Sequence, residues 1–257
     1  MYDQVKDIVG STREMLMPHF GNAVPEKKPG EDTAYAVVTE LDRLIERYLE
    51  SELKKLEPQI PLVGEEYGGS RDHERYWLCD PIDGTAHFIR GMPFCSVMLA
   101  LVERNQVTLS FIYDFVNDQM FHAQRGSGAF ANTKPLRVSD RPLSDSYLSF
   151  ETRTEKPENA NLRERVRKVS ILFSAITAGY EFALVASGKL EGRICMDPYG
   201  KDFDFLPGLL LVEEAGGTVA NLGSRSLDIR NLDFIAANPR VYQELTEGPG
   251  AIFPNRD

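Results

Sequence analysis

The feature that most constrains the fold is a series of apolar or alternating segments in the first half of the chain. The five segments cover residues 60–66, 76–83, 95–103, 107–115 and 119–126. Segments of this length, separated by turn-forming residues, are typical of β-strands. Strands joined by short links pair antiparallel, because parallel neighbours need a longer crossover. The sequence therefore predicts an antiparallel sheet, with hairpin tips at Asn105-Gln106 and Asn117-Asp118.

Helical patterns lie before and after this region. Apolar residues recur at helical spacing over 5–16 and, more regularly, over 41–53. Later in the chain, helical segments near 160–169, 179–187 and 204–215 alternate with strand-like segments at 147–151, 192–196, 217–221 and 233–238. Such alternation is typical of an α/β layer. We therefore predict two halves, 1–142 and 143–257.

The acidic composition restricts the partners. Lys and Arg total 29 and Asp and Glu total 39, so the formal charge is −10. This balance argues against a surface that coats nucleic acid. It would also repel an anionic substrate, so a protein of this charge that handles phosphate needs metal ions or a concentrated basic pocket.

The cysteines and the amino terminus indicate a compartment. Cys79, Cys95 and Cys195 are scattered and form no CxxC pair, which gives no support to a zinc ribbon or a disulfide framework. A reducing cytoplasm fits this pattern best. The first residues lack the basic start and apolar stretch of a signal peptide, and no apolar run approaches membrane-spanning length. We expect a cytoplasmic protein that does not engage a membrane.

The segment 77–85, WLCDPIDGT, indicates the chemistry. An apolar strand ends at Asp80, and Asp83 follows at a turn. Two carboxylates at a strand end can converge on one point while the carbonyl of Ile82 faces the same way, and Mg²⁺ prefers such oxygen clusters. If a helix begins at Thr85, its free N–H groups form a phosphate cradle beside the metal site.

A structural interpretation of the same residues stays open. Asp-Gly is a common turn, and Asp before a helix is a common cap. Two further acidic positions favour the metal site, because Glu65 follows an apolar strand-like segment and Asp204 lies at the start of an apolar helical one. Each also has a structural alternative, a solvated acidic loop for Glu65 and an N-cap for Asp204.

At these positions the sequence resembles the inositol monophosphatase family, whose members are Mg²⁺-dependent, lithium-sensitive phosphatases in one superfamily with fructose-1,6-bisphosphatase. The matching blocks are 38–42, 64–66, 77–85, 126–132, 136–139, Asp204 and 214–217. They occur in the family's order and span nearly the whole chain. The resemblance implies a layered α-β-α-β-α sandwich, with an antiparallel sheet in the first half and a mixed sheet in the second. It also implies a homodimer.

The resemblance further implies a ligand set for two Mg²⁺ ions. Glu65, Asp80 and the carbonyl of Ile82 correspond to ligands of the first ion. Asp80, Asp83 and Asp204 correspond to ligands of the second. All four carboxylates of this set are present in the chain.

Catalytic roles follow from the same resemblance. Asp42, Glu65 and Thr85 correspond to catalytic residues, and in the family the pair Asp42–Thr85 helps to orient and deprotonate the attacking water. Thr39 and Asp42 are also spaced as a capping box, which is a structural device. The catalytic role of Asp42 is favoured only because of the resemblance.

Substrate-binding roles fall on Asp83, Gly84, Thr85 and Asp197. Asp197 takes the place of a Glu that binds a substrate hydroxyl in the family, and it is one methylene shorter. The metal positions are intact while positions on the substrate side have changed. The sequence therefore predicts a phosphatase more firmly than it predicts a particular substrate.

Two departures concern the metals. Ala36 stands where the family has an Asp that supports a third ion, and Asp32 is a weak substitute, so the sequence predicts two ions and leaves a third open. Asp202 lies two residues before Asp204 and is a rival ligand candidate.

The predicted function is Mg²⁺-dependent hydrolysis of a small phosphate monoester by metal-activated water. The expected substrate is an inositol monophosphate or a related sugar or polyol phosphate, and a 3′-phosphonucleotide or histidinol phosphate is an alternative. A non-catalytic regulatory interaction protein on the same fold is the alternative function. A family member that has lost catalytic activity should have lost carboxylates of the metal site, whereas this chain has all four.

Overall fold

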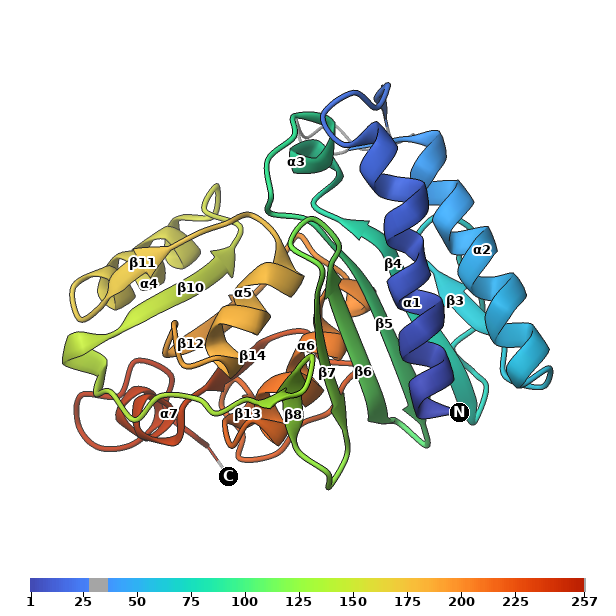
Figure 1. The fold of residues 1–257 in the computed structure, drawn as a ribbon. Helices are drawn as coiled ribbons and strands as arrows, with labels where there is room; N and C mark the ends of the chain where they lie inside the picture. Colours follow the sequence, from blue (N-terminus) through green and yellow to red (C-terminus); the bar gives the residue numbers. More distant parts are fainter. Residues whose placement is uncertain (28–36, 257) are drawn as a thin grey trace.

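The chain folds into five alternating layers of helix and sheet (Figure 1). The structure is a computed structural model that describes residues 1–27 and 37–256. Two large sheets lie between three layers of helices, and each sheet is covered on both faces. This architecture confirms the predicted α-β-α-β-α sandwich.

In the described part of the chain the first sheet has seven strands, in the order β3-β4-β5-β6-β7-β8-β9. They are β3 (Leu62–Gly64), β4 (Arg75–Asp83), β5 (Ser96–Glu103), β6 (Gln106–Asp114), β7 (Gln119–Gln124), β8 (Ala129–Ala131) and β9 (Lys134–Pro135). Pairing is antiparallel from β4 to β7, as predicted, and it continues antiparallel through β8 and β9, which were not among the predicted strands. β3 differs, because it runs parallel to β4. The connection 65–74 is much longer than a hairpin turn, so it can carry the chain back to the same end of the sheet.

The two hairpin tips lie at or beside their predicted positions. Arg104 and Asn105 form the turn between β5 and β6, and both have positive φ (50° and 60°), as a two-residue hairpin requires. Gln106 already pairs with Glu103 in the ladder, so this tip begins one residue earlier than predicted. Asp118 has φ 54° in the turn between β6 and β7.

Helices α1 (Tyr2–Leu16) and α2 (Glu40–Leu56) cover one face of the first sheet (Figure 1). Their apolar residues recur at helical spacing and therefore form a stripe that faces the strands. The fully or almost fully buried residues of this stripe are Val5, Val9, Leu16, Ile45, Leu49 and Leu53. They pack on a second set from the sheet that includes Trp77, Cys79, Val97, Leu99 and Phe111.

Helices α5 (Ala178–Ala186) and α6 (Asp202–Glu214) lie between the two sheets. Apart from the acidic residues at the two ends of α6, they are mostly apolar, as burial on two sides requires. β4 therefore has helices on both faces. Side chains alternate along a strand, so Cys79 faces the α1–α2 layer while Leu78 faces the α5–α6 layer. The alternation directs Asp80 toward the same side as Leu78, which is where α6 lies.

The second sheet is mixed, as predicted, with the strand order β11-β10-β12-β14-β13 in the described residues. Its strands are β10 (Tyr147–Thr152), β11 (Ile171–Phe173), β12 (Gly192–Met196), β13 (Thr218–Asn221) and β14 (Phe234–Ala237). β10 runs parallel to β11 and β12, and β14 runs antiparallel to both of its neighbours. Helices α4 (Pro157–Arg167) and α7 (Pro239–Thr246) pack on its outer face.

The remaining elements are short. They are β1 (Glu26–Lys27), β2 (Val37–Val38), α3 (Thr85–Ile89) and the 3₁₀ turns η1 (Met17–His19) and η2 (Leu143–Asp145). Among the described residues, no helix combines the length and the apolarity that a membrane span needs. Helices α5 and α6, from the second half of the chain, share a hydrophobic core with the first sheet. The division of the chain at residue 142 therefore stays a prediction.

Candidate active site

The carboxyl end of β4 holds two of the predicted ligands. The pairing register between β4 and β5 shifts between Asp80 and Asp83, so the strand is irregular where Pro81 removes a backbone donor. The N–H of Ile82 donates to Oδ1 of Asp80 at 3.0 Å. Both carboxylates are buried, with Asp80 1% and Asp83 5% exposed. The irregularity lets residues on one strand direct two carboxylates to the same region.

Asp83 is held by the amino terminus of α5. Its carboxylate accepts hydrogen bonds from the N–H groups of Ala178 (3.1 Å) and Gly179 (2.8 Å) and from Oγ of Ser96 (3.3 Å). These N–H groups have no partner within the helix, and the helix dipole also favours an anion there. Burial nevertheless dominates and raises the pKa of Asp83 to about 6.

Asp204 reaches the same region from α6, which packs against the first sheet. It lies in the first turn of α6, and its Oδ2 accepts a hydrogen bond from the N–H of Lys201 at 2.6 Å. Burial, and next the charge of Glu65, raise the pKa of Asp204 well above its usual range. Its carboxylate therefore has a capping role and also faces other acids.

The three aspartates meet in space. One carboxylate oxygen from each of Asp80, Asp83 and Asp204 lies within 4.8 Å of the others. Carboxylates so close repel one another unless cations or protons neutralise them. An all-oxygen donor set of this kind suits a hard divalent cation such as Mg²⁺ or Ca²⁺. The residues present therefore fit the predicted metal.

Glu65 lies beside this group but is not one of the three whose oxygens converge. Its N–H donates to the carbonyl of Cys79 (3.1 Å), which fixes its backbone next to Asp80. The charge of Glu65 contributes to the raised pKa of Asp204, after burial. The role of Glu65 as a metal ligand stays a prediction.

Glu46 on α2 holds the Glu65 loop and was missed at the level of sequence. Its two carboxylate oxygens accept hydrogen bonds from the N–H groups of Glu66 (2.8 Å) and Tyr67 (3.0 Å), and it is 1% exposed. A Cβ on Gly64 would lie 1.9 Å from this carboxylate, so any larger residue there would have to displace it. Glu46 follows Asp42 by one helical turn on the buried stripe, and this inward spacing was the signal available.

Asp42 and Thr85 are in contact. Oδ1 of Asp42 accepts a hydrogen bond from the Thr85 hydroxyl at 2.8 Å, and that hydroxyl also lies 3.0 Å from the Ile82 carbonyl. Oδ2 of Asp42 accepts from both the N–H and the hydroxyl of Thr39 at 2.7 Å, so the capping box is present as well. Burial raises the pKa of Asp42 to about 6. The two alternative roles use different oxygens of one carboxylate.

Gly84 connects the strand to α3 in a conformation that demands glycine. Its φ is 84°, and a Cβ there would lie 2.5 Å from Cγ2 of Thr177 and 2.6 Å from the carbonyl oxygen of Phe94. The chain can therefore turn closely under Thr85 only with glycine at this position.

Asp197, predicted to bind substrate, has protein partners. It follows β12 with φ 49°, and its carboxylate pairs with Lys156 at 2.5 Å and accepts from Nδ2 of Asn159 at 3.0 Å. The ammonium of Lys156 lowers the pKa of Asp197. Its substrate role stays a prediction.

The rival ligand Asp202 has a different partner. Its carboxylate forms a two-point ion pair with Arg71, with a distance of 2.7 Å for the Nη2–Oδ1 contact. Asp204 and not Asp202 belongs to the convergent group. Ala36 and Asp32, on which the third ion depends, lie outside the described residues.

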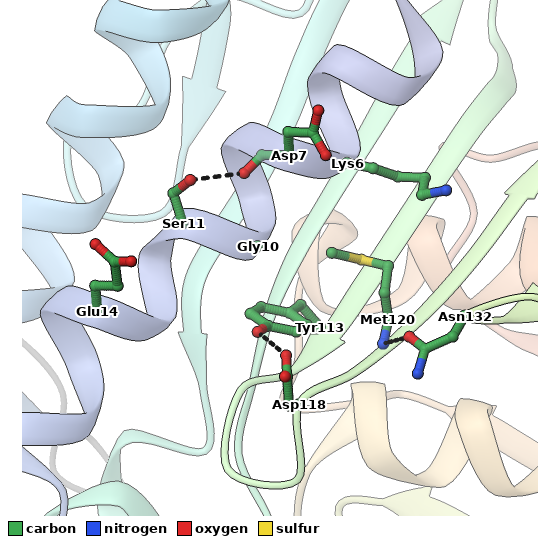
Figure 2. A pocket seen from close by; sticks show the side chains of 9 residues that line it. All are labelled: Lys6, Asp7, Gly10, Ser11, Glu14, Tyr113, Asp118, Met120 and Asn132. Atoms are coloured by element: carbon green, nitrogen blue, oxygen red, sulfur yellow. Dashed lines mark hydrogen bonds between the residues drawn. The ribbon is translucent and has the colours of Figure 1, made fainter.

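A cavity of about 430 Å³ lies elsewhere, between α1 and the β6–β7 hairpin (Figure 2). Within it the Tyr113 hydroxyl donates to Asp118 (2.6 Å), and the N–H of Met120 donates to Asn132 (2.9 Å). None of the convergent aspartates lines this cavity. It is separate from the acidic site.

Comparison with known proteins agrees with this geometry. The model of the family described as "Inositol monophosphatase family" matches residues 3–248. The fructose-1,6-bisphosphatase/inositol-1-monophosphatase of Thermotoga maritima is 31% identical over 244 residues, which cover 91% of this chain and 89% of that protein. The Nus factor SuhB of Xylella fastidiosa is 32% identical over 223 residues, which cover 81% and 80%.

A solved structure extends the likeness to the fold. The IMPase of Thermotoga maritima superposes with a TM-score of 0.83 and 29% identity, over 93% of this chain and 92% of that one. Fold and relatives together define an enzyme of the phosphoric monoester hydrolase class. The chain belongs to the inositol monophosphatase family.

Proposed function

We propose that this protein hydrolyses a small phosphate monoester in a reaction that depends on Mg²⁺. The observation that carries the proposal is the convergence of Asp80, Asp83 and Asp204 within 4.8 Å. Buried like charges at this spacing are costly, and a bound divalent cation offsets that cost. The proposal also includes a cytoplasmic homodimer and sensitivity to lithium, which steady-state assays in LiCl test.

Two ions would be held by the predicted set. Glu65, Asp80 and the Ile82 carbonyl would hold one, and Asp80, Asp83 and Asp204 would hold the other. Mg²⁺, when bound, supplies an acidified water and positive charge against the phosphoryl oxygens. A third ion remains open, since the segment it needs lies outside the described residues.

Thr85 and Asp42 are proposed to orient the attacking water and to accept its proton. With its hydrogen donated to Asp42, the Thr85 oxygen presents a lone pair that can accept a hydrogen bond from water. The Asp42 carboxylate, with a pKa near 6, can hold a proton transiently at neutral pH. The N–H groups of Gly84 and Thr85 are proposed to contact the phosphoryl oxygens.

The experiment is a phosphate-release screen over a panel of monoesters, with Mg²⁺ and with EDTA. The panel contains inositol monophosphates, sugar phosphates that include fructose 1,6-bisphosphate, histidinol phosphate and 3′-phosphorylated nucleotides. Asp83→Asn should abolish the Mg²⁺-dependent release while the circular dichroism spectrum is retained. Asp118→Asn, in an exposed turn outside the acidic group, is the matched control and should release phosphate normally. Unchanged release by Asp83→Asn would refute the assigned role.

A regulatory interaction protein is the second candidate, and the relative named as a Nus factor favours it. The two functions differ in what they require of the carboxylates. If the second is correct, no phosphate is released from any ester, and Asp83→Asn leaves the interaction intact. Retention of the complete carboxylate set favours the hydrolase.

A further inference from the structure

Arg193 on β12 is a buried cation that the proposed reaction does not use. Its side chain is 3% exposed and lies between the two sheets, with Cζ 5.3 Å from the ring centroid of Phe182 and 5.5 Å from that of Phe205. A charge in such an apolar setting persists only where it is paired. Its two anionic partners are Glu181 and Glu151.

The first partner leads to Asp83. Nη1 of Arg193 pairs with Oε2 of Glu181 on α5, and Oε1 of the same carboxylate accepts a hydrogen bond from the N–H of Ala175 at 2.7 Å. Glu181 thereby holds the segment before α5, which contains Ala175, against the first turn of α5. That helix presents the two N–H groups of 178 and 179 that hold the Asp83 carboxylate. The Glu181 side of Arg193 is therefore connected to Asp83 through one rigid helix end.

The second partner leads to Asp204. Nη2 of Arg193 pairs with Oε2 of Glu151, and Oε1 of Glu151 accepts from the N–H groups of Tyr199 (3.0 Å) and Gly200 (2.9 Å). The next residue is Lys201, whose N–H donates to the Asp204 carboxylate at 2.6 Å. The Glu151 side of Arg193 therefore fixes the turn from which α6 and its ligand begin.

We propose that Arg193 is a positioning residue that sets the separation of Asp83 and Asp204, and hence the shape of the metal site, through Glu181 and Glu151. The inference deepens the proposed function and rests on it. The guanidinium is planar and its donors are fixed in a fork, so the two carboxylates it joins cannot move independently. Groups that orient ligands in this way contribute to metal affinity without touching the metal.

Arg193→Lys tests the geometry while it keeps the charge. A lysine ammonium is a point charge on a flexible stem and cannot reproduce the fork that joins both carboxylates. Arg141→Lys is the matched control, because Arg141 also pairs with a fully buried carboxylate, that of Glu191. The bonds of Glu191 run to Ser139, Arg141 and Tyr147, none of which holds Asp83 or Asp204.

Mn²⁺ is the probe, titrated by electron paramagnetic resonance into the full chain without substrate. We expect Arg193→Lys to weaken Mn²⁺ binding by about 10–100-fold, the usual effect of losing a group that orients a ligand. It should raise the Mg²⁺ concentration for half-maximal phosphate release by a similar factor. Arg141→Lys should change neither quantity, even where both variants lose similar thermal stability.

A second variant keeps the test decisive if Arg193→Lys folds poorly. In Glu181→Gln the side-chain oxygen can still accept from Ala175, but the ion pair is gone, so Mn²⁺ binding should weaken in the same direction. The double variant Arg193→Lys/Glu181→Gln should bind Mn²⁺ no more weakly than the single variant with the lower affinity, since both substitutions act through one connection. Fully additive losses would overturn the shared connection.

The outcomes separate this inference from the proposed function. Equal Mn²⁺ affinity in Arg193→Lys and the native protein, or equal weakening in Arg141→Lys, overturns the role of Arg193 alone. Normal Mn²⁺ binding without phosphate release from any ester overturns the hydrolysis alone. No Mn²⁺ binding by the native protein overturns both.

Discussion

Replacing Asp204 with Asn should stabilise the metal-free protein and at the same time remove its metal-dependent activity. The amide oxygen of Asn can keep the hydrogen bond from the Lys201 N–H, which Asp204 accepts at 2.6 Å. Its NH₂ group would then face the neighbouring acids and donate to them. The substitution therefore removes a repulsive charge without leaving the first turn of α6 uncapped.

The size of the effect follows from the spacing of the cluster. The ligand oxygens of Asp80, Asp83 and Asp204 lie within 4.8 Å of one another. At an effective dielectric constant of about 20, two unit charges at that distance repel by about 3.5 kcal/mol. Burial, and next the charge of Glu65, raise the pKa of Asp204, so a charged carboxylate is costly at this position in the absence of metal. We expect Asp204→Asn to add about 1–3 kcal/mol to the free energy of unfolding in EDTA, or about 2–4 °C in Tm per kcal/mol.

Thermal unfolding of the native protein and the variant, each in EDTA and in millimolar Mg²⁺, measures this directly. In EDTA the variant should unfold at the higher temperature. Mg²⁺ should raise the Tm of the native protein by mass action, because the ion binds only the folded state. It should leave the variant nearly unchanged. Loss of a residue that only orients a metal ligand usually costs about 10–100-fold in activity. Phosphate release by the variant should fall by at least this factor, because Asp204 is a proposed ligand itself.

Two results would refute this reasoning. A variant less stable than the native protein in EDTA would show that the Asp204 charge is not under repulsive strain. A variant that gains as much Tm from Mg²⁺ as the native protein would show that Asp204 does not contribute to ion binding.

Three further predictions concern residues around the cluster. An unfolded Asp has a pKa of about 3.9, whereas burial raises the pKa of Asp42 to about 6. Between these two values the folded chain holds a proton that the unfolded chain has lost. Raising the pH from 4 to 7 should therefore lower the contribution of Asp42 to the free energy of unfolding in EDTA by about 3 kcal/mol, measured by urea denaturation. Glu46→Gln leaves one of two backbone donors unsatisfied and should raise the Mg²⁺ concentration for half-maximal activity by about 10–100-fold. Glu50→Gln, at an exposed residue of the same helix, should not, and equal shifts in both variants would contradict the role of Glu46. Gly84→Ala places a Cβ 2.5 Å from Thr177 and should cost more than about 1–2 kcal/mol of stability, which a native-like Tm would contradict.

Local patterns made part of this structure predictable. Hairpins join strands that are neighbours in sequence, so short links were enough to predict the antiparallel sheet as far as β7, whereas the short strands β8 and β9 were not predicted. The positions of Asp80 and Asp83 at a strand end followed from where the apolar segment stops. The choice between Asp202 and Asp204 needed coordinates, because residues two apart on a helix point in different directions, and only contact with Arg71 shows which of them faces away from the cluster.

Long-range partners were the part that sequence could not supply. The donors that hold Asp83 are backbone N–H groups at 178 and 179, and backbone groups carry no residue signature. The parallel pairing of β3 was missed because the connection 65–74 contains no helix to mark a crossover. Lys156, which occupies the Asp197 carboxylate, belongs to a segment with no motif of its own.

The acidic cluster draws its members from two layers, with Asp80 and Asp83 on β4 of the first sheet and Asp204 on α6, more than 100 residues later in the chain. A divalent ion bound there would link segments that are far apart in the sequence. A partly folded chain, in which α6 has not docked, would have no complete cage and so no means of retaining the ion. In the proposed enzyme, a complete metal site would therefore exist only in molecules that have finished folding.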